Sequence, residues 1–304
     1  MDFIDETQGV LKPMATPQVG LAPDRVLAPP PVRGKPKTGG PRPIDATGDA
    51  LQQIAGMMIL CVQAMVACVT PPFTWKYDFI EESWLIVKRC TLPVMLSTTF
   101  FGLGAPGLQG GNITYIFGTV DRLGAFFVMA SVREFAPWIN GMCVAGIGGT
   151  AICADLGARK VREELDALAV LGLDPVRTIV APRFLALGLT TAAMNLIAIV
   201  FGVFGGWIAA VMCFKNTSTA GYLATFTSNF TMPDLLGSVI KTSLFGFIIG
   251  VVMCYKGMNV KGGAEGVGRA VNQGVVIAFA GIWVFNYMFT TTMLAAYPET
   301  GNLH

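Results

Sequence analysis

Charged side chains of both signs gather in one short stretch of an otherwise apolar chain. From residue 155 to residue 172, four acids and three bases stand among a few apolar residues. Those apolar residues stand at i, i+4 and i+7, the spacing of one helical face. They are Val161, Leu165 and Leu168. We therefore predict an amphipathic helix over residues 159–171, ended by Gly172 and the following Asp174–Pro175.

The polar face of this predicted helix is suited to binding a partner. Three opposite-charge pairs stand four residues apart, but the base precedes the acid in each, so each contributes about 0.2–0.5 kcal/mol at most. A helix that only rests on lipid has a mainly basic polar face, so this mixed face favours a soluble protein partner. Resting on the membrane surface is the alternative. The pairs are Arg159 with Glu163, Lys160 with Glu164, and Arg162 with Asp166.

No set of residues in the chain combines a nucleophile with a general base. The only histidine is His304, so hydrolytic chemistry would need an unusual base. The seven cysteines are scattered in or beside apolar stretches without a CxxC pair, whereas a zinc site needs clustered ligands. We interpret them as buried thiols and expect no metal site, no disulfide framework and no catalytic residues.

Two glycine-rich motifs imitate nucleotide-binding loops. Gly102–Gly107 has the spacing GxGxxG, but it contains a proline, lies in an apolar run and follows no strand. Gly263–Ala270 has the glycines of a phosphate loop without its Lys and Ser/Thr, and we interpret it as a tight cytoplasmic turn. We therefore expect the chain to bind no cofactor and not to hydrolyse ATP itself.

The composition indicates that much of this chain is surrounded by lipid. Of 304 residues, 53% are hydrophobic and 13% are charged, whereas a soluble domain carries roughly 25% charged residues. A membrane-spanning helix needs about 20 mostly apolar residues. Five runs meet this need, so we predict an all-α integral membrane protein with five spans. The runs are Leu92–Gly111, Leu123–Ile152, Phe184–Phe214, Leu235–Tyr255 and Ala270–Tyr297.

A sixth apolar run, Leu51–Thr70, is assigned from the charges around it. Basic loops stay cytoplasmic, and the bases concentrate in segments 156–183 and 256–269. Five spans then place the N-terminus in the cytoplasm and the C-terminus outside. If 51–70 also crossed, the bases of the N-terminal tail would lie outside. We therefore predict an interfacial helix and elbow over residues 46–90, followed by a five-span domain over 91–298.

The first 45 residues differ from the rest of the chain. Residues 1–45 hold half of the 18 prolines and show no periodic hydrophobicity. Such a composition cannot bury a core, so we predict a disordered cytoplasmic tail. The net charge of the whole chain is only +2, so we expect no nucleic acid partner.

Charged residues also occur inside the predicted spans, where they are costly and often functional. Arg133 and Glu134 stand in the second span and Lys241 in the fourth. Adjacent residues face different directions on a helix, so Arg133 and Glu134 should not pair with each other. Either they line a polar cavity, or the span begins late and leaves both at the outer interface. We expect Lys241 to extend its ammonium group to the membrane surface.

Small residues recur at four-residue spacing within the spans. Such pairs let two helices approach closely, although glycine is also generally frequent in membrane helices. The pairs are Gly107 with Gly111, Gly202 with Gly206, and Gly246 with Gly250.

Several motifs resemble the signature of the MlaE/YrbE permeases. The longest match is GGTAICADLGARKVREELDALAVLGLDP at 148–175. REFAP at 133–137 resembles that family's R-E-L-G-P, and APRF at 181–184 and the run 257–271 also fit. CADLGAR and CYKG make the chain similar to the A-type permease of actinobacterial Mce systems. The resemblance covers about residues 50–297.

This resemblance implies the membrane subunit of an ABC-type lipid transporter in the cytoplasmic (inner) membrane. The subunit would pair with a B-type YrbE paralogue or a second copy, and with ATPases that bind ATP and Mg. MCE-domain proteins would lie on the outer side. The cargo would be an imported lipid: a fatty acid, a mycolic-type lipid, a phospholipid or a sterol. The outer-membrane lipid version carries Arg in A-G-R-A-G-S, where this chain has AGIGGT at 145–150, so the role of that Arg does not transfer.

The resemblance also implies roles for individual residues. The predicted helix at 159–171 would be the coupling helix, with acids facing the ATPase. Its residues would be Arg159, Arg162, Glu163, Glu164, Asp166 and Leu168. The lipid would lie between two permeases, against the first and last spans. The candidates for this path are Phe100, Phe101, Leu103, Leu108, Arg133, Glu134, Phe285, Tyr287 and Phe289.

Two other functions are compatible with a multi-span protein. An ion-coupled secondary transporter needs intramembrane carboxylates or a repeat of broken helices. Glu134 is the one carboxylate inside a predicted span, and we find no internal repeat. A non-transporting scaffold for other membrane proteins is the second alternative.

Overall fold

The structure, a computed structural model, describes residues 43–71, 75–214 and 218–297. The chain divides into two units, Met1–Ala46 and Thr47–His304. The first unit is described only at its last residues, where a helix begins. The predicted proline-rich tail therefore lies almost wholly outside the described residues.

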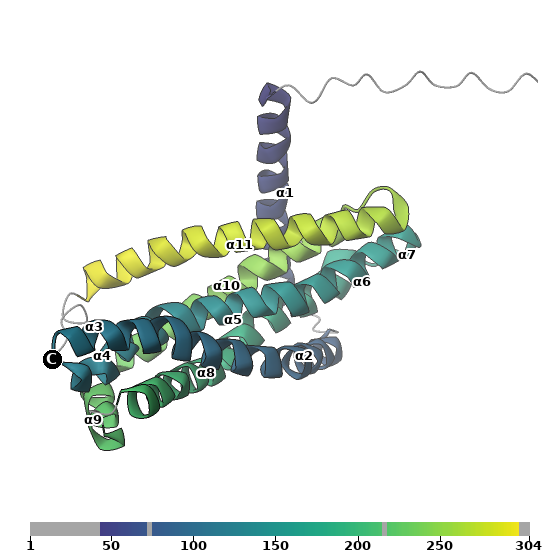
Figure 1. Cartoon of the computed structure of the whole chain (residues 1–304). Coiled ribbons are helices and arrows are strands. Elements are labelled where there is room, and N and C mark those ends of the chain that lie inside the picture. Colours follow the sequence, from purple (N-terminus) through teal and green to yellow (C-terminus); the bar gives the residue numbers. More distant parts are fainter. Residues whose placement is uncertain (1–42, 72–74, 215–217, 298–304) are drawn as a thin grey trace, which may run out of the picture. The chain divides into compact units, whose positions relative to one another are not determined.

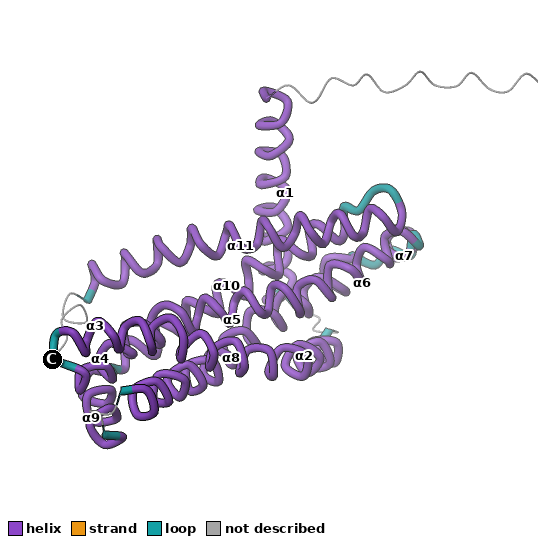
Figure 2. The backbone as a smooth tube through the Cα atoms, in the orientation of Figure 1, coloured by secondary structure: helices purple, strands orange, loops and turns teal. Residues whose placement is uncertain are grey.

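Every regular element of the described residues is a helix (Figure 2), which confirms the predicted all-α class. Elements η1 and η3 to η6 are π-helical, and η2 is a 3₁₀ turn. The elements are α1 Pro43–Val69, α2 Lys76–Gly102, η1 Leu103–Gln109, α3 Gly110–Ile116, η2 Val120–Arg122, α4 Leu123–Phe127, η3 Val128–Phe135, α5 Ala136–Val144, η4 Ala145–Gly149, α6 Thr150–Val161, α7 Glu164–Val170, η5 Val176–Val180, α8 Ala181–Ile208, η6 Ala209–Cys213, α9 Thr219–Asn229, α10 Met232–Met258 and α11 Gly263–Ala296.

Some of these elements follow one another without a break and form longer helices. Elements α4 to α6 make one helix of 39 residues, and η5 to η6 make one of 38 residues. Within the described residues, five helices are long and apolar enough to cross a membrane, the number we predicted. They are Leu51–Val69, Leu123–Val161, Val176–Cys213, Met232–Met258 and Gly263–Ala296.

Four of these five helices contain predicted spans, and the fifth is the run assigned to the membrane surface. The remaining predicted span, Leu92–Gly111, lies in α2, η1 and α3, where Pro93, Pro106 and Gln109 interrupt the apolar run. Helix α1 runs across α10 and α11 instead of along them (Figure 1). A helix in that direction lies along a membrane that the other helices span. The interfacial position of α1 stays a prediction with this geometry in its favour.

Helix α1 is fastened to the bundle by a few specific contacts. The ammonium group of Lys256 donates to the side-chain oxygen of Gln53 at 2.6 Å and to that of Gln273 at 3.1 Å. Gly56 lies against the ring of Tyr255, where a Cβ atom would come within 2.6 Å of the hydroxyl oxygen. The opposite face of α1 exposes apolar side chains, which suits contact with lipid.

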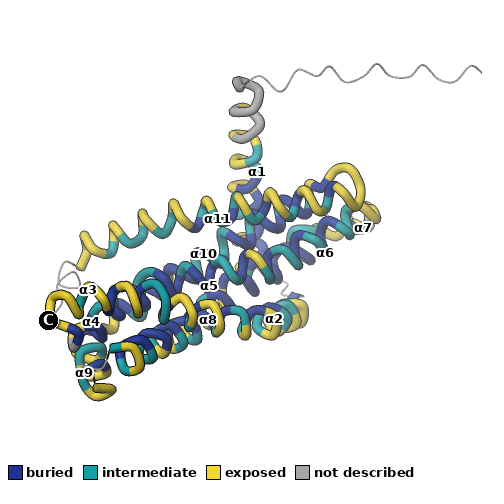
Figure 3. The backbone as a smooth tube through the Cα atoms, viewed as in Figure 1, coloured by how far each residue is buried: buried dark blue, intermediate teal, exposed yellow. Residues whose placement is uncertain are grey.

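Helices α2 and α8 pack with their backbones in contact. A Cβ atom on Gly102 would lie 2.5 Å from the carbonyl oxygen of Gly202, and one on Gly205 would clash with the carbonyl of Thr99. Without a hydrophobic driving force between helices in lipid, close packing of this kind holds them together. The GxGxxG motif at 102–107 therefore serves helix packing. Figure 3 shows the resulting burial along α5, α8 and α10, whereas α11 is largely exposed.

The predicted turn at Gly263–Ala270 is wrong in its position. The chain turns at 259–262, and Gly263 already begins α11. Gly262 and Gly263 have φ values of 93° and 66°, which only glycine adopts without strain. The later glycines of the motif belong to the helix, because Gly266 must pass close to the carbonyl of Lys261.

We expect Gly102→Ala to destabilise the protein by about 1–3 kcal/mol, because its Cβ atom overpacks the contact with Gly202. Thermal unfolding in detergent measures this change. Gly104→Ala is the matched control, since no atom lies within 4 Å of its Cβ position. An equal loss of stability in both variants would contradict the backbone contact.

Candidate functional site

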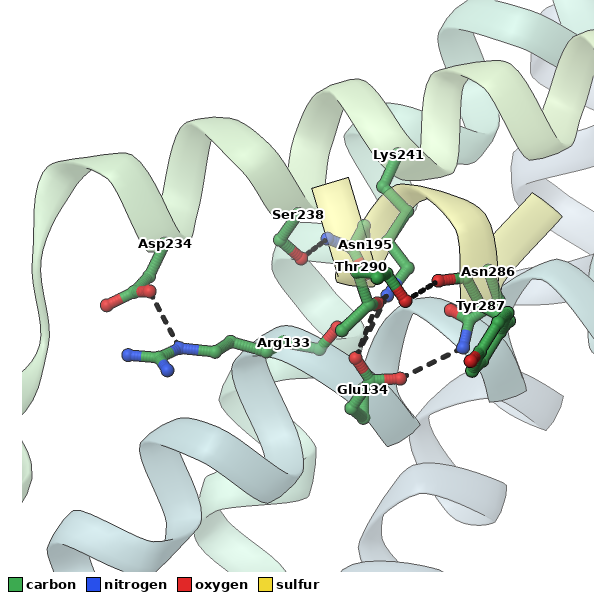
Figure 4. Close-up of polar contacts among 10 residues, drawn as sticks. Arg133, Glu134, Asn195, Asp234, Ser238, Lys241, Asn286, Tyr287 and Thr290 are labelled. Atoms are coloured by element: carbon green, nitrogen blue, oxygen red, sulfur yellow. Dashed lines mark hydrogen bonds and ion pairs between the residues drawn. The ribbon is translucent and has the colours of Figure 1, made fainter. Parts of the chain in front are cut away.

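Polar and charged side chains meet inside the bundle where η3, α8, α10 and α11 face one another (Figure 4). We call these residues the polar cluster. Within a bilayer such groups must find partners inside the protein, so their arrangement shows what the bundle is built around. The cluster consists of Arg133, Glu134, Asn195, Asp234, Ser238, Lys241, Asn286 and Thr290.

Lys241 is the most deeply buried charge of the polar cluster, with a side chain only 2% exposed. Its ammonium group lies 3.3 Å from a carboxylate oxygen of Glu134. It also donates to the carbonyl oxygen of Arg133 at 2.9 Å and to the hydroxyl oxygen of Thr290 at 2.8 Å. Three acceptors thus meet the three donors of an ammonium group.

Glu134 completes the same network from η3. Its Oε1 accepts from the hydroxyl of Thr290 at 2.7 Å, and its Oε2 accepts from the amide of Asn286 at 2.9 Å. Thr290 therefore accepts a hydrogen bond from the ammonium group and donates one to the carboxylate. Residues 286 and 290 are one helical turn apart on α11, so a single face of that helix is bonded to η3 and α10.

Arg133 forms a second, separate ion pair. Its Nε lies 2.7 Å from Oδ1 of Asp234, whose side chain is 4% exposed. The other carboxylate oxygen of Asp234 accepts from the backbone N–H and the hydroxyl of Thr231, which caps α10. The same acid therefore starts α10 and binds it to η3.

The two neighbours Arg133 and Glu134 reach different partners, as expected for adjacent residues of a helix. We considered two positions for this pair, the lining of a polar cavity and the outer interface. The structure gives both side chains polar partners within the bundle. The prediction for Lys241 is wrong: its ammonium group does not extend to the membrane surface. Burial is tolerated because carboxylate, carbonyl and hydroxyl oxygens replace the water that the group loses.

A cavity of about 280 Å³ opens beside the polar cluster. Arg133, Glu134, Asp234 and Lys241 form its charged side. The remaining wall is mainly apolar. It consists of Phe126, Met129, Ala130, Gly237, Ser238, Phe289, Thr290, Met293 and Leu294. The cavity therefore offers charges and apolar surface side by side, which suits an amphipathic molecule.

The structure brings only some of the predicted lipid-path residues together. Arg133, Glu134 and Phe289 line the cavity, and the ring of Phe285 lies 5.9 Å from that of Phe289. Tyr287 is exposed on α11. The candidates of α2 and η1 are absent from the lining of this cavity. They are Phe100, Phe101, Leu103 and Leu108.

Sequence reasoning missed several members of the polar cluster, although signals for them exist. Thr231, Pro233 and Asp234 form a helix-start pattern, which marks Asp234 as a cap. Lys241 follows Asp234 by seven residues, or two helical turns, and so lies on the same face. Asn195, Asn286 and Thr290 carry no comparable signal, because polar residues of this kind are common in membrane helices.

At the other end of the long helices, the predicted helix 159–171 is broken in two. Helix α6 ends at Val161 and α7 begins at Glu164. Between them Glu163 has a φ of 60°, the left-handed conformation that breaks a helix. Sequence periodicity missed this break, since no Gly or Pro marks it. The predicted end is confirmed: Gly172 has a φ of 76° just after α7.

Because of this break, the three predicted ion pairs do not form, and each base pairs with another acid. Arg159 pairs with Asp155 at 3.0 Å, Lys160 with Asp166 at 2.8 Å, and Arg162 with Glu164 at 2.6 Å. The hydrogen bond from Arg162 lowers the pKa of the Glu164 carboxyl and raises the pKa of the guanidinium group. Glu164 is therefore ionised at neutral pH.

Helix α7 presents both charged and apolar side chains to its surroundings. The side chains of Glu164 and Asp166 are 44% and 61% exposed. Beside them Val170 and Leu171 are 88% and 74% exposed, although they lie in a hydrophilic loop. Leu165 is buried and Leu168 partly buried, so they fix the helix to the bundle. Exposed apolar residues with a polar rim mark a surface that contacts a protein or a membrane.

Among the described residues, no group of three or more His, Cys, Asp or Glu side chains could hold a metal ion. The seven cysteines are all free, and none forms a disulfide.

We expect Glu134→Leu to cost about 3 kcal/mol of stability, because it leaves the buried ammonium group of Lys241 without its counter-charge. Lys241→Met should cost less, since Glu134 is 41% exposed and keeps its bonds from Asn286 and Thr290. Thermal unfolding in detergent measures both. The double variant should be more stable than Glu134→Leu. A larger loss of stability in Lys241→Met than in Glu134→Leu would contradict this explanation.

The chain is similar to several known proteins. A protein named probable ABC transporter permease, from Rickettsia typhi, is 33% identical over 227 residues, which cover 75% of this chain and 86% of the relative. The intermembrane phospholipid transport system permease protein MlaE of Haemophilus influenzae is 26% identical over 218 residues, covering 71% and 83%. A chloroplastic protein of Arabidopsis thaliana, TRIGALACTOSYLDIACYLGLYCEROL 1, is 29% identical over 207 residues, covering 65% and 56%.

Residues 79–292 match the family described as Permease MlaE. This range contains the polar cluster, the broken helix α6–α7 and most of α11. Its relatives in Rickettsia and Haemophilus are named permeases, so the prediction of a transporter subunit and not an enzyme is confirmed. The resemblance drawn from the motifs is confirmed as well: the chain belongs to the MlaE permease family.

Proposed function

We propose that this chain is the membrane subunit of a lipid transporter driven by a separate ATPase. Family membership supports a permease, and the Haemophilus relative is named for phospholipid transport. The Rickettsia relative is named as an ABC transporter permease, a class that works with a separate ATP-hydrolysing partner. This chain carries no phosphate loop of its own.

The observation that carries the proposal is the exposed surface of α7. It combines the acids Glu164 and Asp166 with the apolar side chains of Val170 and Leu171. A surface of this kind fits a groove on a soluble ATPase, with the apolar residues as anchors and the acids at the rim. Because α7 lies between two long apolar helices, a displacement of α7 moves both of these helices.

The proposed lipid path includes the cavity beside the polar cluster. A lipid has a polar head and apolar chains, and the cavity places the polar cluster, with Arg133 and Glu134 in its wall, next to Phe289 and Met293. We infer that a head group binds at the charged side while the chains lie along α11. Helix α11 suits this role because only 17% of its most apolar stretch is buried.

The exposed apolar side of α11 also supports pairing with a second permease. The partner would be a B-type paralogue or another copy of this chain, with MCE-domain proteins on the outer side. The basic loops argue for a cytoplasmic N-terminus and an external C-terminus in the inner membrane. Import is the direction that the resemblance to Mce systems suggests.

Ion-coupled transport is less well supported. A coupling carboxylate must release its partners to take up an ion or a proton. Glu134 is held by Lys241, Thr290 and Asn286 together. A carboxylate with three donors is suited to a structural network more than to exchange.

We expect Val170→Asp to lower the affinity for the ATPase about 30-fold, which corresponds to losing one interface hot spot of about 2 kcal/mol. The combined change Glu164→Arg and Asp166→Arg should also weaken binding, through like-charge contact. Purification of the full chain with its native partners, followed by mass spectrometry, measures the ATPase and the bound lipid. Glu265→Arg is the control, because this exposed acid lies in the first turn of α11, outside α7.

Retention of the ATPase and of lipid uptake in both α7 variants would show that α7 is not the docking element. Purification of the wild-type complex without any ATPase would overturn the proposed function itself.

A further inference from the structure

A single arginine joins three helices at the end of the bundle that carries α7. Arg183 lies in the first turn of α8, and its side chain is only 7% exposed. Its Nε donates to Oε1 of Glu82 in α2 at 2.8 Å, and its Nη2 donates to Oδ2 of Asp155 in α6 at 2.5 Å. Oδ2 of Asp155 also accepts from Nε of Arg159 at 3.0 Å. These residues form a continuous chain of ion pairs from α6 to α2.

The ion pairs line one part of a cavity of about 620 Å³. Its walls come from the first half of α2, from α6 and η4, from Leu168 of α7, from η5 and from the start of α8. Further along the same long helix, Gly148 packs against Ile86 and Cys90 of α2. Beside the cavity, the guanidinium group of Arg183 bridges α2 and α6 through Glu82 and Asp155. The cavity also leaves room for one wall to move relative to the other.

A second arginine of the same segment binds the end of α1. Nη2 of Arg177 donates to the carbonyl oxygens of Thr70 and Pro71, each at 2.6 Å. These carbonyls lie at or just beyond the C-terminus of α1, where a cation is favourable. The side chain of Asp174 accepts from the backbone N–H of Val176 and so positions the turn that leads into both arginines. The segment after α7 thus holds α1 through Arg177 and α2 through Arg183.

Helix α2 continues this connection toward the other end of the bundle. It packs along α8 through backbone contacts at Gly102 with Gly202 and at Thr99 with Gly205. Two helices in such close contact cannot slide freely past each other. A displacement of the start of α2 is therefore carried along its length.

We propose that Arg183, together with Glu82 and Asp155, is the positioning element that transmits movement of α7 to α2. The inference rests on the proposed docking of an ATPase at α7. Movement of α7 displaces α6, to which it is joined at Glu163, and Asp155 moves with α6. The fork of the Arg183 guanidinium group then pulls Glu82 and the start of α2. Without this bond the cavity absorbs the displacement, and ATP hydrolysis no longer drives transport.

Arginine is required at position 183 because its planar group holds two carboxylates at once. A lysine keeps the charge but has a single nitrogen, so it cannot hold Glu82 and Asp155 in the same geometry. In Arg183→Lys, the lipid moved per ATP should therefore be nearly as low as in Arg183→Gln. This comparison separates a geometric link from a simple need for positive charge.

The test uses the complete transporter, reconstituted with its ATPase and MCE partners in vesicles. The variants are Arg183→Gln, Arg183→Lys and Glu82→Gln. The control is Arg269→Gln, which breaks an Arg–Glu pair of similar length within α11. ATP hydrolysis is measured together with transfer of radiolabelled phosphatidylethanolamine, or of radiolabelled oleate if wild type does not move the phospholipid. We expect the lipid moved per ATP to fall roughly 2- to 30-fold in the variants and to stay unchanged in the control.

A second measurement needs no lipid and reports the transmission directly. Spin labels introduced as unnatural amino acids at Tyr77 of α2 and at Leu173 just after α7, both exposed and outside the proposed docking surface, give the distance between these two helices. In wild type this distance should stay constant when ATP binds, because both helices move together. In Glu82→Gln, which keeps the bond between Arg183 and Asp155, the distance should change on ATP binding.

The proposal is overturned if the lipid moved per ATP stays at the wild-type value in Arg183→Gln and Glu82→Gln. It is also overturned if transport falls only in proportion to the amount of assembled complex, since the residues would then act on stability alone. These outcomes are distinct from failure of the proposed function, in which the wild-type complex contains no ATPase or the α7 variants retain it.

Discussion

A charged side chain inside a bilayer must find its partners within the protein. The ammonium group of Lys241 meets this demand with one carboxylate, one carbonyl and one hydroxyl oxygen. Those partners come from η3 and α11, while the lysine comes from α10. The orientation of three helices around this point therefore follows from the need to satisfy one buried charge.

The rest of the bundle is organised by close approach of backbones. Glycines at 102, 202 and 205 bring α2 against α8, and Gly246 brings α10 against the carbonyl of Leu187 in α8. In lipid the apolar surfaces of helices gain nothing by leaving the solvent, so dispersion contacts and polar bonds hold the bundle. Helix α8 is consequently the common neighbour of α2 and α10. Its first turn carries Arg183, so one helix unites the glycine contacts with the ion pairs beside α7.

The two ends of the molecule differ in what they can bind. Beside the polar cluster, a cavity combines fixed charges with apolar walls, an arrangement that suits an amphipathic ligand. At the end with α7, an exposed surface of acids and apolar residues suits a soluble protein. The helix from 123 to 161 runs between these regions, with Arg133 and Glu134 in one and Asp155 in the other. In the proposed transporter, this helix connects the ATPase-docking surface with the lipid-binding cavity.

Sequence alone determined the properties that depend on neighbouring residues. The apolar runs predicted the all-α class and the number of long apolar helices, and local motifs identified the family. The end of α7 at Gly172 also followed from its residues. Periodicity could not find the break at Glu163, because no proline or glycine marks it. The left-handed conformation of this residue belongs to the folded loop. Sequence reasoning also placed the ammonium group of Lys241 at the membrane surface, because hydropathy records the charge but not the partners 107 and 49 residues away. Only the tertiary structure brings Glu134 and Thr290 to that ammonium group, or Glu82 and Asp155 to Arg183. Satisfaction of a buried charge depends on distances through space, and these arise only when the helices pack.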